Sequence, residues 1–266
     1  MLRIFRFILN SATMRNNTPA QTLVMCIVWG SSFVVQIVTL YLLTRRKLMR
    51  QFPVFYGYTV FHVIQGAASI IAWNISYKAY FYEWWTGELL DALVTLAVIQ
   101  EIFAVTFEPY EELKQWGGRF FMILAIVLCF VAVLTATNSP NPDYTPRVQM
   151  LLTLQRSVSF VEVGLLFFLF VLCRLFGMTW RHYTFGIASG FVVMSSIYTA
   201  ANAVRMHYGN AVDAWTGLSE SAGFALAVFV WTYYFASSKS RVPLDDVPGT
   251  AQLVAWNRAL ADIGQR

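Results

Sequence analysis

Seven stretches of predominantly apolar residues, each long enough to cross a lipid bilayer as a helix, dominate this chain. They cover residues 23–44, 53–75, 81–107, 120–137, 149–173, 183–203 and 214–236. A helix needs about 20 such residues to cross a hydrocarbon core of roughly 30 Å. Helices satisfy their backbone polar groups within one segment, which lone strands in lipid do not. The sequence therefore predicts an all-α, polytopic membrane protein built as a seven-transmembrane-helix bundle.

The composition supports the same interpretation. The 266 residues are 58% hydrophobic and 12% charged, whereas about a quarter of the residues of a soluble domain are charged. So few charges leave large apolar patches, which must meet lipid. This composition excludes a disordered chain, a nucleic-acid-binding domain and a disulfide-built secreted module. Cys26, Cys129 and Cys173 all lie inside apolar stretches and are interpreted as small buried hydrophobes.

Two short tails flank the transmembrane domain at 23–236. Residues 1–22 are predicted to form an N-terminal tail, and residues 237–266 a C-terminal tail. Within the second tail, residues 250–263 place apolar side chains on one face at helical spacing, which predicts an amphipathic helix. Such a helix either lies against the membrane or docks a cytoplasmic partner.

Lysine and arginine are more frequent in cytoplasmic loops than outside, and their distribution predicts the orientation. Twelve lysines and arginines fall in the loops after odd-numbered helices and in the C-terminal tail, and six fall on the opposite side of the membrane. Arg205 is counted among these six. The N-terminus is therefore expected outside and the C-terminus in the cytoplasm.

The residue inventory excludes several activities. A retinal protein needs a lysine near the middle of its last helix, and the three histidines, His62, His182 and His207, are too few for a haem or a catalytic zinc. Neither a Gly-x-Ser-x-Gly elbow nor a Gly-rich phosphate loop is present. The four lysines all lie in loops or at helix ends: Lys47, Lys78, Lys114 and Lys239. We therefore expect no catalytic residue, no metal, no cofactor and no nucleic-acid partner, and hence a protein that is not an enzyme.

Ionisable residues within the apolar stretches are the candidates for function, because a charge inside the membrane is costly and normally faces a partner or water. A rise of about 1.5 Å per residue places four of them at similar depth in the outer half. Arg156 is the only cation among them and is expected to be the hub that the carboxylates surround. Its planar guanidinium can bind a carboxylate in a bidentate manner. The full predicted outer cluster comprises Glu88, Asp91, Arg156, Glu220, Tyr198 and Asn202. It is interpreted as a structural staple, a ligand pocket, or an ion or proton path.

A second, inner layer is predicted nearer the cytoplasm. His62 and Glu162 lie at depths that allow them to pair. Glu101 lies close to the inner end of its helix, where Arg181 or Arg119 could reach it.

Several short stretches, taken in order, resemble a group of seven-helix bacterial inner-membrane proteins abundant in acidobacteria. The resemblance implies a multi-pass protein of the inner (plasma) membrane with the same topology, and it implies no reaction. In that group the residue before the arginine that corresponds to Arg156 is commonly glutamate, whereas here it is Gln155. The position of Glu162 is commonly glutamine in that group. The stretches that carry the resemblance are 52–55, 80–85, 101–103, 109–113, 155–157, 164–170, 175–181, 185–191 and 255–260.

These observations favour a non-enzymatic membrane sensor or receptor-like protein whose outer polar pocket takes a small polar or cationic ligand. In this interpretation the cytoplasmic segment at 250–263 contacts a partner. The alternatives are a small transporter or proton-coupled permease that uses the same carboxylates, and a structural subunit of a membrane complex.

Overall fold

The computed structural model describes residues 19–108, 146–175 and 182–237, with a few isolated residues between 122 and 130. These parts are helical and contain no strand. Two 3-10 turns, at Leu48–Arg50 and Gly209–Val212, connect neighbouring helices. The six long helices are α2 (Pro19–Arg45), α3 (Pro53–Ile75), α4 (Tyr77–Thr106), α6 (Pro146–Leu175), α7 (His182–Tyr208) and α8 (Asp213–Ala236).

The all-helical character is confirmed for the described residues, and their long apolar helices support a multi-pass membrane protein. Five of the described helices, α2, α3, α4, α6 and α7, are long and apolar enough to cross a membrane. Most of the expected span at 120–137 lies outside the described residues, as does the amphipathic segment at 250–263. The count of seven spans and the orientation of the termini therefore stay predictions.

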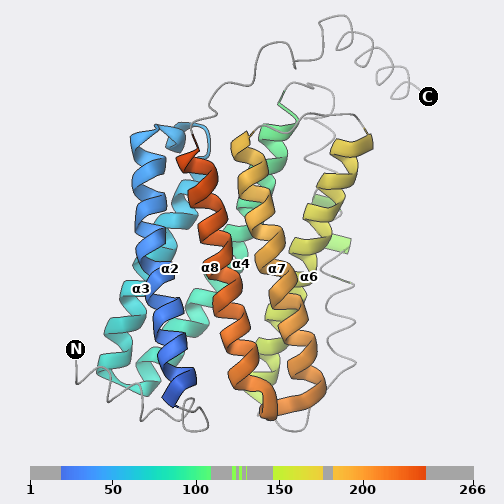
Figure 1. Cartoon of the computed structure of the whole chain (residues 1–266). Helices are drawn as coiled ribbons and strands as arrows, with labels where there is room; N and C mark the ends of the chain where they lie inside the picture. The colour runs from blue at the N-terminus through green and yellow to red at the C-terminus, as the bar shows by residue number, and fades with distance from the viewer. Residues whose placement is uncertain are drawn as a thin grey trace, which may run out of the picture.

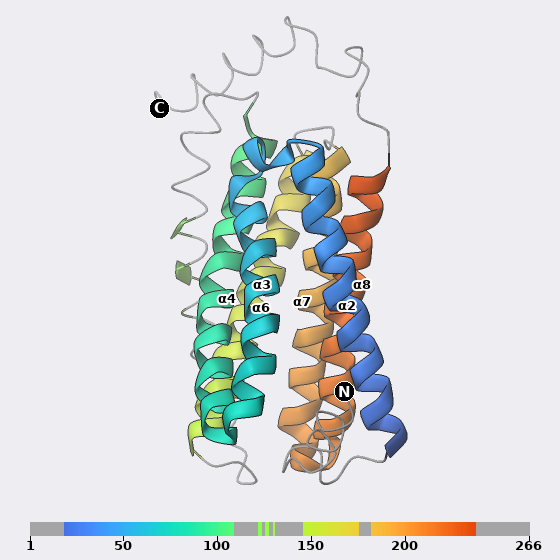
Figure 2. The same cartoon turned by 90° about the vertical axis from the view of Figure 1, so that its left-hand side faces the viewer.

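The six helices form a closed ring. Around it, α2 packs on α3, α3 on α4, α4 on α6, α6 on α7, α7 on α8, and α8 again on α2. An additional contact between α4 and α7 crosses the ring. All six helices run roughly along one common axis (Figures 1 and 2). We call the end where α2 and α8 finish and α3 begins the Arg46 end, and the opposite one, where α7 meets α8, the Arg205 end.

Local sequence signals place the breaks between helices. Pro53 lies in the first turn of α3, where its missing N–H costs nothing. Ser76 ends α3 and also caps α4, because its hydroxyl accepts the Ala79 N–H at 3.1 Å. The turn after α7 uses Gly209 at φ 64°, a left-handed conformation that favours glycine. The connection expected at residues 74–79 is thus a single-residue break.

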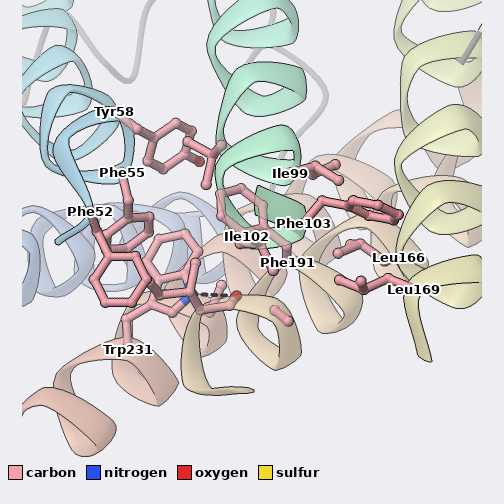
Figure 3. Packing of buried hydrophobic residues seen from close by; sticks show 14 of the residues in the cluster. Phe52, Phe55, Tyr58, Ile99, Ile102, Phe103, Leu166, Leu169, Phe191 and Trp231 are labelled. Carbon is pink, nitrogen blue, oxygen red and sulfur yellow. Dashed lines mark hydrogen bonds between the residues drawn. The ribbon is translucent and has the colours of Figure 1, made fainter. Parts of the chain in front are cut away.

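Large aromatic side chains fill the centre of the ring towards the Arg46 end (Figure 3). Phe55 packs edge-to-face against Trp231, with ring centroids 5.1 Å apart, and both side chains are buried. The Trp231 indole N–H donates to the Ile187 carbonyl at 3.1 Å, so its buried polar group is satisfied.

At the Arg46 end, one arginine joins three helices. The Arg46 guanidinium donates to the carbonyls of Ala236 and Ser237 at 2.7 and 3.0 Å, and to the Tyr183 hydroxyl at 3.1 Å. A cation at the carbonyl end of a helix is favoured by the helix dipole and by the unpaired carbonyls there. Arg46 therefore ties α2 to the end of α8 and the start of α7.

Candidate functional site

A small polar cavity lies where α4, α6 and α7 meet. Its volume is about 30 Å³, which is room for about two water molecules at 10–15 Å³ each. Three carboxylates line it, and its lining contains no lysine or arginine. The lining residues are Glu88, Asp91, Ala92, Gln155, Val158, Ser159, Glu162, Met194 and Tyr198.

The cavity lies near the middle of the helices that line it. Asp91 follows the first residue of α4 by 14 positions and precedes its last by 15, which is about 21 and 22 Å at 1.5 Å per residue. Glu162 lies 16 positions after the start of α6 and 13 before its end. Both carboxylates are therefore far from either end of the bundle.

His62 of α3 connects to this cavity through Asp91. Its Nε2 lies 2.8 Å from Asp91 Oδ1, and the two side chains are 14% and 25% exposed. The Tyr58 ring packs against the imidazole with centroids 4.4 Å apart. His62 is thus held in place by a carboxylate on one side and an aromatic ring on the other.

Glu162 has a different partner from the one that its depth predicted. Its Oε2 accepts the Ser195 hydroxyl at 2.6 Å, and the side chain is 5% exposed. The expected pairing of His62 with Glu162 is therefore replaced by His62 with Asp91 and Glu162 with Ser195. The two predicted layers are one cluster, because Asp91 and Glu162 line the same cavity.

Arg156 does not act as the predicted hub within the described residues. Asp91 contacts the imidazole of His62, and Glu220 forms an ion pair with Arg205. No contact among the described residues links either carboxylate to Arg156. The reason is helical geometry: Gln155 lines the cavity, and the next residue of a helix points about 100° away from it.

The hub is Arg205, which sequence reasoning assigned to a loop. Its guanidinium forms a bidentate pair with the Glu220 carboxylate, with nitrogen-to-oxygen distances of 2.9 and 3.0 Å. Arg205 is 8% exposed because α7 continues to Tyr208 instead of ending near residue 203. The signal for this lies in the sequence, since no glycine or proline interrupts the segment before Gly209.

The guanidinium makes further contacts. It donates to the Thr216 hydroxyl at 3.1 Å and to the Asn202 side-chain oxygen at 3.2 Å, and it lies 3.4 Å from Asp213. This cluster fastens α7 to α8 at the Arg205 end. It accounts for the predicted site residues Glu220 and Asn202 as parts of a helix staple.

Part of the predicted outer cluster is nevertheless brought together. Glu88 lies within electrostatic range of Asp91, Glu162, Glu220 and Arg205. Tyr198 lies within electrostatic range of Glu88 itself and of the same three carboxylates, but Arg205 is not among its neighbours there. The carboxylates of the cavity and the Arg205 staple are therefore electrostatic neighbours, and Arg205 takes the place expected for Arg156.

Glu101 has a structural task at the Arg46 end. Its two carboxylate oxygens accept the backbone N–H groups of Val54 and Phe55, each at 2.8 Å. A carboxylate at a helix N-terminus satisfies unpaired donors and interacts favourably with the helix dipole. Glu101 thus caps α3, and its expected contact with an inner-loop arginine stays a prediction. Arg181 and Arg119 lie outside the described residues.

The chemistry available at the cavity is that of carboxylates without a fixed counter-cation. Among residues 19–108, 146–175 and 182–237, no three His, Cys, Asp or Glu side chains are grouped so as to hold a metal ion. Carboxylates at this depth need protons, a small cation or water to offset the cost of burying charge. Such a site can take up and release protons.

Comparisons of the chain with protein-family models, with curated proteins and with solved structures give no match.

Proposed function

We propose that this protein is a small proton-conducting membrane permease in which the carboxylates of the cavity bind the transported proton. One observation carries the proposal: Glu88, Asp91 and Glu162 surround a water-sized cavity at mid-depth without a lysine or arginine among the lining residues. Intramembrane carboxylate and histidine chains are typical of proton relays in pumps and transporters. His62, hydrogen-bonded to Asp91, supplies the histidine.

The size of the cavity favours a proton over an organic solute. Small-molecule sites occupy about 300–1,000 Å³, roughly ten times the 30 Å³ found here. A proton needs only a titratable group and a hydrogen-bonded neighbour. The cavity provides three carboxylates and the Tyr198 hydroxyl.

The second candidate is a sensor in which protonation of the same cavity alters the contact with a partner. The aromatic packing favours it, because Phe55, Phe191 and Trp231 are fully or almost fully buried and occupy the centre of the ring beside the cavity. Close aromatic packing of this kind disfavours a continuous water column. A sensor would bind protons without carrying them across.

A flux measurement separates these candidates. The purified protein is reconstituted in liposomes that contain a pH-sensitive dye, and a potassium gradient with valinomycin drives proton entry. A permease acidifies the lumen, and Asp91→Asn abolishes this flux while Glu108→Gln, the same type of change at an exposed position after α4, leaves it intact. Lack of flux combined with pH-dependent carboxyl bands in infrared spectra would select the sensor. If neither proton flux nor pH-dependent carboxyl bands are observed, both the permease and the sensor are contradicted.

A further inference from the structure

The surroundings of the cavity differ between the two ends of the bundle. Toward the Arg46 end, each of the three helices that line the cavity buries apolar side chains that are 0% exposed. We call these side chains the apolar seal. They are Ile99 and Ile102 of α4, Leu166 and Leu169 of α6, and Ile187 and Phe191 of α7.

The apolar seal begins close to the carboxylates. Leu166 follows Glu162 by four residues, which is about one helical turn. Figure 3 shows Ile99, Ile102 and the two leucines of the seal between α4 and α6. Close-packed apolar side chains leave few voids larger than a water molecule, and moving a charge into them is costly. The seal therefore opposes proton transfer from the cavity toward the Arg46 end.

Toward the Arg205 end, polar side chains continue from the cavity. Glu88 precedes Asp91 by three residues, so it shares a helix face with it and lies about 4.5 Å nearer the Arg205 end. On α7, Tyr198 is followed at spacings of four and three by Asn202 and Arg205, which places all three on one face. The polar side chains thus lead from the cavity to the Arg205 staple.

Glu88 is the carboxylate that connects the two regions. It lines the cavity, and it lies within electrostatic range of Glu220 and Arg205 of the staple. The staple itself reaches the surface, because the Asp213 side chain is 46% exposed. The charged and titratable groups around Glu88 are Asp91 of α4, Glu162 of α6, Tyr198 and Arg205 of α7, and Glu220 of α8.

The Glu88 side chain also differs from the other two carboxylates of the cavity in its contacts. Each of those accepts or shares a short hydrogen bond with a neighbouring helix. Glu88 has no hydrogen bond to any of the described residues. Its carboxylate is therefore the one that can exchange a proton without first breaking a contact within the bundle.

We propose that in this conformation the cavity exchanges protons with the Arg205 end alone, and that Glu88 is the residue through which they enter. A hydronium ion at that end gives a proton to the Glu88 carboxylate and becomes water. A water molecule in the cavity then accepts this proton from Glu88 and gives one of its own to Asp91. Glu88 ends ionised as before, the cavity water is unchanged, and Asp91 has gained the proton. This inference rests on the proposed function and names the entry step of its route.

The first test is a one-sided acid jump on protein of known orientation in liposomes. Time-resolved infrared spectra follow the protonation of the carboxylates. We expect protonation to be about tenfold faster or more when the Arg205 side is acidified than when the Arg46 side is, the scale of one proton-transfer group.

The orientation in the liposomes is read from single cysteines at exposed positions. His207→Cys marks the Arg205 end and Arg50→Cys marks the Arg46 end. A membrane-impermeant maleimide labels whichever of them faces outward. These variants are made in a chain whose own cysteines are replaced by serine: Cys26, Cys129 and Cys173.

The second test removes the entry carboxylate. Glu88→Gln nearly keeps the side-chain shape, and we expect it to slow both protonation from the Arg205 side and the liposome flux by about tenfold or more. Glu88→Asp keeps a carboxylate and should retain more of both than Glu88→Gln. Glu83→Gln is the matched control, because it is the same change on the same helix, in a side chain that binds Ser69 and does not line the cavity.

The outcomes keep this inference separate from the proposed function. Protonation that is equally fast or faster from the Arg46 side overturns the inference. If Glu88→Gln conducts like the unaltered protein while Asp91→Asn does not, Glu88 is not the entry residue and the cavity stands. If Asp91→Asn also conducts normally, both proposals fail. If Glu88→Gln melts much lower than the unaltered protein, the acid jump on the unaltered protein decides, because it needs no variant at position 88.

Discussion

Arg205 and Glu220 form a bidentate ion pair that links consecutive helices, with nitrogen-to-oxygen distances of 2.9 and 3.0 Å. The two hydrogen bonds of the pair join residues that are fifteen positions apart in the sequence, across the turn between α7 and α8. The same guanidinium also binds Asn202 and Thr216, so the pair is one part of a hydrogen-bond network. It fixes how the two most extensively packed helices of the ring meet.

Breaking this pair from one side should destabilise the protein. Arg205→Met leaves the Glu220 carboxylate without its partner, and loss of one partner of a buried pair costs about 3–5 kcal/mol. Thermal unfolding in detergent measures the effect. The double variant Arg205→Met/Glu220→Leu should recover most of the loss, because no buried charge is left over. A single variant as stable as the unaltered protein would show that the pair contributes nothing.

The carboxylate cap on α3 gives a second prediction. Glu101→Gln replaces one accepting oxygen by an amide NH₂, which faces a backbone N–H of Val54 or Phe55 instead of accepting from it. We expect a loss of about 1–2 kcal/mol, the usual cost of losing a helix cap. Chemical denaturation of the detergent-solubilised protein measures it. Gln100→Ala at the exposed neighbouring position of α4 is the control, and an equal effect of both changes would count against a capping role.

Arg46 gives a third prediction, because neighbouring arginines differ in their contacts. Arg46 binds the carbonyls at the end of α8, whereas Arg45 is exposed. Arg46→Gln should lower stability by about 1–2 kcal/mol through loss of charge-assisted hydrogen bonds. Arg45→Gln should change stability by less than about 0.5 kcal/mol, as expected of a surface position. Limited proteolysis of the two variants provides the comparison, and equal cleavage rates would contradict the role given to Arg46.

The helices could be predicted from sequence because length and hydropathy fix them locally. Segments such as 53–75 match the observed α3 to the residue. The break between α3 and α4 was harder to place, since Ser76 alone ends one helix and caps the next. Helix ends depend on such single contacts, and apolar stretches do not reveal them.

The site residues could be predicted as a set, but their partners could not. Depth along the chain brought Glu88, Asp91 and Tyr198 together, because the rise per residue is constant. Which side of a helix faces which neighbour depends on packing of the whole ring, and this decided that Gln155 and not Arg156 lines the cavity.

Small residues on α7 allow close approach of α8, which gives the fourth prediction. A Cβ atom at Gly190 would overlap the Trp231 indole, whose N–H bonds the Ile187 carbonyl. Gly190→Ala should therefore destabilise by about 1–3 kcal/mol, the usual cost of overpacking. Gly217→Ala is the matched control: nothing lies within 4 Å of its Cβ position, so the gain in helix propensity should stabilise α8 by up to about 1 kcal/mol. Thermal unfolding followed by tryptophan fluorescence measures both. If Gly190→Ala melts at or above the temperature of the unaltered protein, the close packing of α7 on Trp231 is not a determinant of stability.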